Sequence, residues 1–472
     1  MDRRTFLSGA GAAVALSLVS ARTAFADQQA TVTSLAELQQ AINGATAGTT
    51  ITVANGTYDV PSGSPITITN RHGSSSAPIT IVAQSRGGVV LTGEQSFVFA
   101  GSSNVTLSGF AFRQSTTLEI PADCSRIRLT RNDLQLAAAA GHWVVVRGDD
   151  AKIDRNVFHD KSTLGVYLVV DGPGAEAMAQ RTYILRNYFR DHTYGGSNGG
   201  EPIRLGVSGR ALSTADATVE YNLFERCNGD PEAISVKSSG NTIRYNTIRS
   251  SLGGLVLRHG NQNRVESNYL LSGQNGIRIY GNDHLIVNNY VDGVAGAGVV
   301  LGSGTERDHY EGEPSSSRTG NDAPDRVTIV LNTLRNNGQA LAGESQRTVP
   351  PLGCVIADNL MAGDSGELVN MPYLDGLTWS GNLLWGQATN GNIPSGFTRA
   401  DPKLVAGADG VYRLGAGSAA VNAASLDHSG QVTEDLDGQA RITPYDVGAD
   451  EYSPASPVRR PLTPAEVGPA AP

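Results

Sequence analysis

One short pattern recurs through the middle of the chain: an alternating apolar run, an asparagine, a second apolar pair, and then glycine or serine. Asn222, Asn246, Asn268 and Asn289 follow one another at intervals of 24, 22 and 21 residues. A period of this length, made of runs too short for the hairpins of a barrel, is typical of a solenoid. Further members of the set are Asn156, Asn332, Asn359 and Asn382.

Each turn of such a solenoid would hold three short strands with polar corners. Asparagine at a fixed corner can adopt the left-handed backbone conformation and hydrogen-bond to its neighbours along the axis, forming a ladder. The comb of leucines that marks leucine-rich repeats is missing. With 56 glycines and only 17% charged residues, the composition also disfavours helical bundles. We therefore predict an all-β, single-domain right-handed parallel β-helix.

The ends of the chain predict additional parts. Residues 1–26 read as a twin-arginine export signal, because Arg3-Arg4 precedes an apolar run too short to span a bilayer. A periplasmic or extracellular location follows. Residues 27–452 would form the β-helix, and the proline-rich residues 453–472 would form a flexible tail.

A capping helix is predicted at the N-terminal end of the solenoid. Ser34 and Glu37 have the spacing of a capping box, and Leu35, Leu38 and Ile42 would share one apolar face. Such a helix would cover the first coil, whose apolar cross-section and strand edges are otherwise open. The polar residues 302–325 interrupt the repeat and predict a loop over one face.

Charge and cysteine content limit the possible partners. The chain has 36 Lys+Arg and 45 Asp+Glu, a formal net charge of −9, which is opposite to that of a typical nucleic-acid binder. We expect no nucleic-acid partner, no membrane association and a monomer. The three cysteines are odd in number and far apart, which argues against a disulfide framework.

A stripe of basic residues crosses consecutive repeats of this acidic protein. Lys237 is one of only four lysines, and Arg258 follows it after 21 residues, one repeat later. This spacing would stack the two side chains on adjacent rungs. Arg278 lies in the next coil and Arg204 lies upstream.

Carboxylates accompany the stripe. Asp230 and Glu232 are two residues apart, so on a strand they share a face, and with the amide oxygen of Asn198 they could bind a hard cation such as calcium. A solvated corner is the plainer alternative. Strict alternation would put Lys237 on the face opposite Glu232, so a bulge or corner must lie between them.

At these residues the chain resembles polysaccharide lyase family 6, which holds alginate lyases and chondroitinase B. The resemblance extends from the N-terminal cap to Glu451. It implies a calcium ion held by Asn198, Asp230 and Glu232, although the family typically has Glu where this chain has Asp230. The matching motifs are Asp230-x-Glu232-x4-Lys237, Arg258-His259 and Asn198-x2-Glu201-x-Ile-Arg204.

The resemblance implies an enzyme that cleaves alginate, an anionic polysaccharide, by β-elimination and releases unsaturated oligosaccharides. Lys237 would be the base that removes the C5 proton. Arg258 would donate a proton to the leaving oxygen or stabilise its charge. The expected substrate-binding residues are Glu201, Arg204, His259, Arg278 and Tyr280.

Three other functions stay open. A lyase of the same family could act on chondroitin or dermatan sulfate, although the acidic balance favours an unsulfated substrate. A β-helix glycoside hydrolase would use a pair of acids such as Asp230 and Glu232 but would leave Lys237 and Arg258 without a role. A non-catalytic carbohydrate-binding β-helix would need aromatic platforms, and aromatic residues make up only 6% of the chain.

Overall fold

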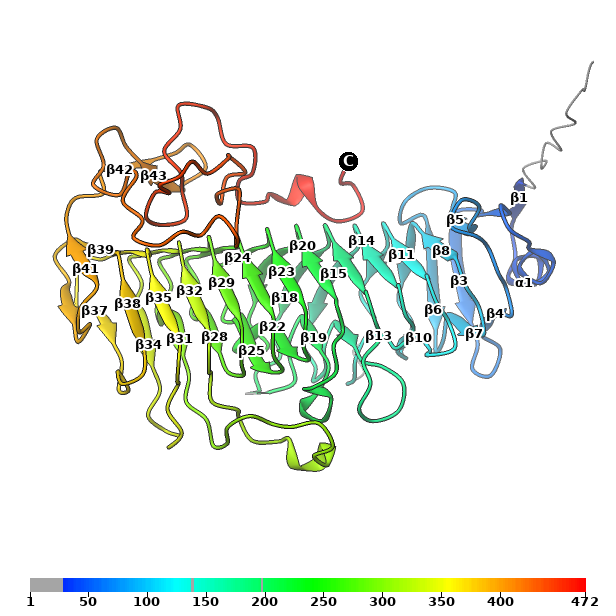
Figure 1. Cartoon of the computed structure of the whole chain (residues 1–472). Coiled ribbons are helices and arrows are strands. Elements are labelled where there is room, and N and C mark those ends of the chain that lie inside the picture. Colours follow the sequence, from blue (N-terminus) through cyan, green and yellow to red (C-terminus); the bar gives the residue numbers. More distant parts are fainter. Residues whose placement is uncertain (1–28, 137–139, 197) are drawn as a thin grey trace, which may run out of the picture.

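The computed structural model describes residues 29–136, 140–196 and 198–472. The export signal predicted at residues 1–26 lies outside the described residues. The chain forms one elongated right-handed parallel β-helix, and the all-β prediction is confirmed (Figure 1). Nearly every coil contributes one strand to each of three long parallel sheets, as the repeat predicts.

The first sheet has 14 strands in the order of the chain. They are β1 (Gln29–Val32), β2 (Thr50–Val53), β5 (Ile79–Ala83), β8 (Val105–Ser108), β11 (Arg128–Thr130), β14 (Lys152–Asp154), β17 (Tyr183–Leu185), β20 (Thr218–Glu220), β23 (Thr242–Arg244), β26 (Arg264–Glu266), β29 (Leu285–Val287), β32 (Thr328–Val330), β35 (Val355–Ala357) and β38 (Thr378–Ser380).

The second sheet has 11 strands and carries the candidate site described below. They are β10 (Leu118–Ile120), β13 (Val144–Val146), β16 (Leu168–Val170), β19 (Ile203–Leu205), β22 (Glu232–Lys237), β25 (Gly254–His259), β28 (Ile277–Ile279), β31 (Ala297–Leu301), β34 (Gln339–Gly343), β37 (Glu367–Asn370) and β40 (Thr389–Gly391).

The third sheet again has 14 strands. They are β3 (Gly56–Val60), β6 (Val89–Gly93), β9 (Phe110–Phe112), β12 (Asp133–Leu134), β15 (Val157–Lys161), β18 (Tyr188–His192), β21 (Leu223–Cys227), β24 (Thr247–Arg249), β27 (Tyr269–Leu271), β30 (Tyr290–Asp292), β33 (Thr333–Arg335), β36 (Leu360–Ala362), β39 (Asn382–Trp385) and β41 (Phe397–Arg399). Two smaller pairs are β4 (Ile66–Thr69) with β7 (Phe97–Ala100) and β42 (Leu404–Ala406) with β43 (Tyr412–Leu414).

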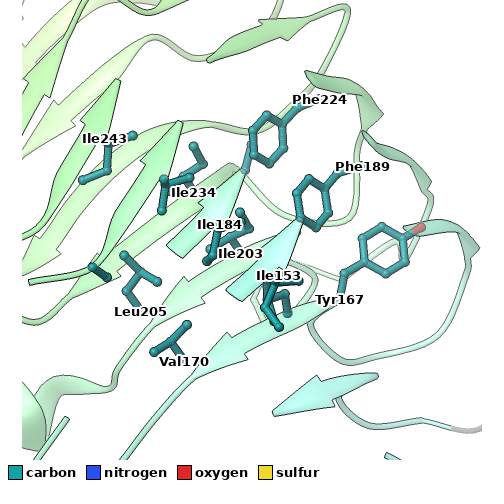
Figure 2. Packing of buried hydrophobic residues seen from close by; sticks show 14 of the residues in the cluster. Ile153, Tyr167, Val170, Ile184, Phe189, Ile203, Leu205, Phe224, Ile234 and Ile243 are labelled. Atoms are coloured by element: carbon teal, nitrogen blue, oxygen red, sulfur yellow. The ribbon is translucent and has the colours of Figure 1, made fainter. Parts of the chain in front are cut away.

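The interior of the coils is filled by stacked apolar side chains. Phe158, Phe189 and Phe224 occupy equivalent positions in successive coils, and their rings stack with centroids 4.9 Å apart. Figure 2 shows Phe189 and Phe224 beside the isoleucines of neighbouring strands. Each fully buried side chain of this size contributes about 1.5–3 kcal/mol. Because similar residues lie on top of one another, the same cross-section repeats from coil to coil.

The predicted asparagine ladder runs along one corner of this core. The Oδ1 atom of Asn187 accepts hydrogen bonds from the backbone N–H and the Nδ2 of Asn156, at 2.9 and 3.0 Å. Asn187 donates the same pair to Oδ1 of Asn222. Equivalent bonds join a buried series: Asn132, Asn156, Asn187, Asn222, Asn246, Asn268, Asn289, Asn332, Asn359 and Asn382.

The ladder asparagines do not adopt the left-handed conformation, so that part of the prediction is wrong. The residue immediately before the asparagine does so instead, as at Arg155 (φ 55°), Arg186 (φ 52°) and Tyr245 (φ 57°). The preceding residue makes the tight corner, which leaves the asparagine amide aligned with the axis. In that alignment the amide accepts hydrogen bonds from the asparagine of one neighbouring coil and donates hydrogen bonds to the asparagine of the other.

The N-terminal end is capped by α1 (Leu35–Gly44), as predicted (Figure 1). The hydroxyl of Ser34 accepts from the backbone N–H of Glu37 at 3.2 Å, and Leu38 and Ile42 are buried. The carboxylate of Glu37 turns to the backbone N–H of Thr33 at 2.7 Å. Among the described residues, α1 is the one α-helix, and no helix is long and apolar enough to cross a bilayer.

The chain beyond β41 turns back and runs along the outside of the coils (Figure 1). His428 hydrogen-bonds to Asp358 at 2.7 Å, with both side chains buried. The backbone N–H of Ala449 donates to the hydroxyl of Thr333 at 2.9 Å. This segment therefore covers part of the solenoid wall.

The prediction of a flexible tail at residues 453–472 is wrong. Leu462 and Val467 are buried against Leu223, and the backbone N–H of Leu462 donates to the hydroxyl of Thr247 at 2.9 Å. Arg131 donates to the carbonyl of Ala471 at 2.6 Å. Apolar side chains lie on the outer wall of the coils, and the few apolar residues of the tail pack against them. The composition of the tail alone does not predict this packing.

The three cysteines, Cys124, Cys227 and Cys354, are buried and unbridged. Burial raises the pKa of Cys124 to about 11 and that of Cys354 to about 12. They contribute as small apolar residues of the core.

Removing one rung of the ladder should destabilise the whole stack. Asn268→Ala removes the bonds of a fully buried amide to Asn246, Asn289 and the carbonyl of Ile243. We expect a loss of about 3 kcal/mol or more in the free energy of unfolding, because buried partners are left unpaired. Denaturant unfolding measures it, and the exposed Asn370→Ala is the matched control. Equal stability of the two variants would contradict a structural role of the ladder.

The C-terminal segment should make stability depend on pH. Burial raises the pKa of Asp450 to about 7 and that of Asp435 to about 6. In the folded state the two carboxyls keep their protons up to about pH 6 to 7, whereas in the unfolded chain they lose them near pH 4. The free energy of unfolding therefore falls as pH rises from about 4 to 7. Asp450→Asn removes this ionisable group. We therefore expect the stability of the variant, measured relative to the wild type, to be higher at pH 8 than at pH 5.

Melting temperatures at the two pH values measure this effect. Asp375→Asn, an exposed position, is the control. The same difference between variant and wild type at both pH values would contradict the assignment.

Candidate active site

The candidate site lies on the outer face of the second sheet. Arg204 on β19, Ser235 on β22, Val256 on β25 and Arg278 on β28 pair in register, so they form one row across the coils. Neighbouring strands are about 4.8 Å apart. Arg204 and Arg278 therefore lie in one row on the sheet, and Ser235 and Val256 lie between them.

Strand β22 is irregular at both ends, and the predicted bulge is confirmed. Its pairing with β25 shifts between Glu232 and Ile234 and again between Val236 and Lys237. The second shift pairs Lys237 with His259, so the predicted stacking of Lys237 on Arg258 is wrong. The extra residue in β25 is Arg258, which the bulge displaces from the rung.

Seven of the ten predicted site residues line one cavity of about 570 Å³ over these strands. Glu201, Arg204 and Tyr280 are not part of its wall. The predicted residues in the wall are Asn198, Asp230, Glu232, Lys237, Arg258, His259 and Arg278, and with them stand Val207, Ser208, Pro231, Thr319 and Arg347.

Lys237 faces a carboxylate. Its Nζ lies 3.7 Å from Oε1 of Glu201, whose side chain is 2% exposed. The other oxygen of Glu201 is buried and has no hydrogen-bond partner among the described residues. Glu201 is therefore a buried support for Lys237. It does not line the cavity, and its contact with substrate stays a prediction.

Asp230 and Glu232 have different environments. Burial, and next the charge of Glu201, raise the pKa of Asp230 to about 6. Its carboxylate accepts the backbone N–H of Glu232 at 3.0 Å. Glu232 accepts from Ser235 at 2.5 Å and pairs with Arg278 at 3.1 Å.

These residues fit a cation. The raised pKa of Asp230 and the unpaired oxygen of Glu201 show negative charge that the neighbouring groups do not fully compensate. The exposed amide of Asn198 lines the same cavity and adds a neutral oxygen. Oxygen ligands of this kind are those that calcium prefers.

Two closer groups of acidic residues or histidine occur elsewhere among the described residues. They are Glu306 with His309 and Glu313, and Asp435 with Asp437 and Asp450. Neither group belongs to the cavity around Lys237.

His259 is a neutral group. It is 4% exposed, and burial with the nearby charge of Arg258 lowers its pKa to about 3. It therefore carries no positive charge at neutral pH. Its Nδ1 is buried and has no partner among the described residues. The contact of His259 with substrate stays a prediction.

Tyr280 is buried (1% exposed) and does not line the cavity, so its contact with substrate stays a prediction. Its hydroxyl donates to Glu344 at 2.6 Å. The guanidinium groups of Arg258, Arg278 and Arg347 lie 5.6, 5.7 and 5.1 Å from the centre of its ring. The ring attracts these three cations and holds them at one place.

Arg347 is a site residue that the sequence analysis missed. It lines the cavity, and it pairs with Glu344 at 2.9 Å. Both residues follow β34 in a loop outside the repeat, so no period places them beside Arg278.

Arg204 stands outside the cavity wall. Its Nη2 lies 3.4 Å from Nε2 of His142. Burial, and next the charge of Arg204, lower the pKa of His142 to about 4. Arg204 thus extends the positive face toward the N-terminal coils.

The segment at residues 302–325 lies over one side of the site, as predicted. Its Asn321 accepts a hydrogen bond from Nη1 of Arg258 at 2.8 Å. Its Arg318 donates to the carbonyl of Gly209 at 3.1 Å. The insert thus joins a coil after the site to a turn before it.

Comparison with known proteins gives one family. The family model described as Chondroitinase B matches residues 32–299. A search of curated proteins found no match.

Solved structures agree with the family model. PL6 family alginate lyase AlyGC is 25% identical with a TM-score of 0.73, and the match covers 92% of this chain and 60% of that chain. A mannuronic acid specific family 6 lyase from human gut microbiota is 25% identical with a TM-score of 0.70, covering 79% and 91%. The family 6 lyase Pedsa3628 from Pseudopedobacter saltans, 22% identical with a TM-score of 0.66 and covering 93% and 99%, shares the fold. The present chain spans about three fifths of the length of AlyGC.

Proposed function

The chain belongs to the Chondroitinase B family, polysaccharide lyase family 6, and from this premise we propose that it cleaves alginate by β-elimination. The observation that carries the proposal is the cavity in which Lys237, Arg258 and Arg278 stand together on an otherwise acidic protein. Two family members that are 25% identical to it are named as an alginate lyase and a mannuronic acid specific lyase.

The reaction needs a base and positive charge. The C5 proton of a uronate is α to a carboxylate, and it is barely acidic while that carboxylate keeps its full charge. Arg278 lines the cavity beside its partner Glu232, and its guanidinium can also bind the substrate carboxylate, which stabilises the charge that develops when the proton leaves. Glu201 holds Lys237 in place at 3.7 Å. The uncharged amine of Lys237 takes the C5 proton and becomes an ammonium, which the carboxylate of Glu201 stabilises.

The leaving oxygen needs a partner on the other side of the scissile bond. Arg258 is placed for this, because it lines the same cavity and forms no ion pair with any described carboxylate. Its positive charge is available to the oxygen as the bond breaks. The neutral ring of His259 can bind a sugar hydroxyl beside it.

A calcium ion would add to the neutralisation of the substrate carboxylate. Asn198, Asp230 and Glu232 are the residues that would hold it, next to Glu201. When bound, the ion supplies positive charge where the enolate-like intermediate gathers negative charge. Asp230 is one methylene shorter than the glutamate usual in the family.

The family name supports a second substrate. A chondroitin or dermatan sulfate lyase would use the same base and would also bind sulfate groups. Arg347 is the added cation in the cavity, but Glu344 pairs with it at 2.9 Å. Arg278 is paired with Glu232 in the same way, so this contact does not decide between the substrates. The acidic balance of the chain favours the unsulfated polymer, alginate.

A hydrolase is disfavoured by the same contacts. Glu232 is engaged by Arg278 and Ser235, so it is poorly placed to activate water or protonate a leaving group. A non-catalytic binding protein would need neither Lys237 nor the unpaired Arg258.

Lys237→Ala should abolish cleavage. With alginate as substrate, the wild type should generate the ultraviolet absorbance of the unsaturated uronate, and the variant should lose at least about 1000-fold in kcat, because the base is removed. Lys237→Arg keeps the positive charge but cannot act as a base, and it should be equally inactive. Lys152→Ala, on the first sheet, is the control.

The outcomes separate the candidates. Full activity of Lys237→Arg would show that only the charge at this position matters. New reducing ends without the chromophore would indicate hydrolysis, and faster cleavage of dermatan sulfate than of alginate would favour the second substrate.

Calcium binding should depend on pH. Because the pKa of Asp230 is raised to about 6, protons compete with the metal as pH falls through 6. We expect calorimetry to show one calcium site at pH 8 that weakens at least tenfold by pH 5 and is lost in Glu232→Ala. Undiminished alginate cleavage after thorough chelation would contradict an essential ion.

A further inference from the structure

We propose that Asn321, in the insert at residues 302–325, is a positioning residue that fixes the guanidinium of Arg258 for the chemical step. The inference rests on the proposed function, since it assigns Arg258 to the leaving oxygen. It gives the insert a specific task at the site.

The base of the insert holds Asn321 by its backbone. Its carbonyl accepts from the backbone N–H of Thr305 at 2.9 Å. The next residue, Asp322, forms a parallel bridge with Glu306 and accepts the backbone N–H of Asp308 at 2.7 Å. Asn321 is therefore set on a short tied segment and is 4% exposed.

The far part of the insert is anchored to another coil. Arg318 is buried and donates to the carbonyl of Gly209 at 3.1 Å. The short helix η2 (Ser315–Ser317) packs against η1 (Ser208–Arg210), which follows β19. Anchors at both ends restrict the insert and, with it, the amide that faces Arg258.

Arg258 is bound by a neutral amide, whereas the two neighbouring arginines are bound by carboxylates. Nη1 of Arg258 donates to Oδ1 of Asn321 at 2.8 Å. Arg278 and Arg347 pair with the carboxylates of Glu232 and Glu344. A neutral amide orients a guanidinium without cancelling its charge, whereas a carboxylate would do both.

The bulge at Arg258 explains why it needs such support. Because this residue is displaced from the rung that pairs Lys237 with His259, no neighbouring strand fixes its side chain. The ring of Tyr280, 5.6 Å from the guanidinium carbon, attracts the cation but does not set its rotation. The amide of Asn321 supplies that direction.

Asn321 also has a second hydrogen-bonding group. Its Nδ2 is buried and has no partner among the described residues. Buried donors are normally paired, so the orientation of the amide is set by its bond to Arg258 and not by a bond of this donor.

The first test is a double-mutant cycle on alginate cleavage. We expect Asn321→Ala to lower kcat about tenfold with KM nearly unchanged, because orientation matters in the chemical step. In the Arg258→Ala background the same substitution should change kcat less than twofold, since Asn321 acts through Arg258. Equal effects of Asn321→Ala in both backgrounds would overturn the proposal.

The second test changes charge and keeps the acceptor. Asn321→Asp should still orient Arg258 but should cancel its charge and repel the polyanion, so we expect a higher KM that depends strongly on salt and a lower kcat. Glu311→Ala, on the exposed part of the same insert, is the control and should leave both constants unchanged. An Asn321→Asp enzyme with wild-type constants would contradict the importance of a neutral partner.

Failure of the proposed function is a separate outcome. A wild-type protein that cleaves no uronate polymer overturns the proposed function and this inference with it. An active wild type with an equally active Asn321→Ala variant overturns only the role of Asn321. Circular dichroism melts of each variant show whether a loss of activity reflects unfolding.

Discussion

The site depends on the regular spacing between one coil and the next. Parallel strand pairing fixes the distance between coils, and the buried asparagine ladder repeats that distance at a corner with side-chain bonds of 2.9–3.0 Å. Residues 20 to 35 positions apart in sequence are therefore neighbours on one face. Asp230 and Lys237 come from the coil of β22, and Arg258 and Arg278 come from the next two coils. These four residues therefore meet without a long-range loop.

The second sheet departs from regularity where the chemistry is proposed. The extra residue in β22, Ala233, brings Glu232 and Lys237 to one side, which a regular strand would separate. A second shift, in β25, displaces Arg258 from its rung. Regular coils on both sides hold the irregular pair in place, so the rest of the stack stabilises a local backbone that is less favourable on its own.

The electrostatics explain how an acidic protein could bind a polyanion. Three arginines gather around the ring of Tyr280, and Lys237 stands at the edge of the same cavity. Two of the arginines have carboxylate partners of their own, and Arg258 has an amide. Positive charge is thus concentrated at the cavity around Lys237, whereas the net charge of −9 belongs to the chain as a whole.

Much of this arrangement could be predicted from residues that repeat. The interval of the asparagines predicted the coils, the spacing of Ser34 and Glu37 predicted α1, and the conflict of faces between Glu232 and Lys237 predicted a bulge. The size of the bulge, and hence the pairing of Lys237 with His259, could not be predicted, because alternation does not say which strand carries the extra residue. Arg347 and Asn321 lie in segments without a period, and only the folded chain brings Arg347 to the cavity and Asn321 to Arg258.

The C-terminal segment changes how the solenoid can lose its structure. In a stack whose coils touch only their neighbours, the last coils can open without disturbing the first. Here the segment after β41 contacts Thr333, Thr247 and finally Arg131, more than 300 residues earlier in the chain. Opening at the late coils would pull on contacts of the early ones, so the one-dimensional stack is closed into a single cooperative unit.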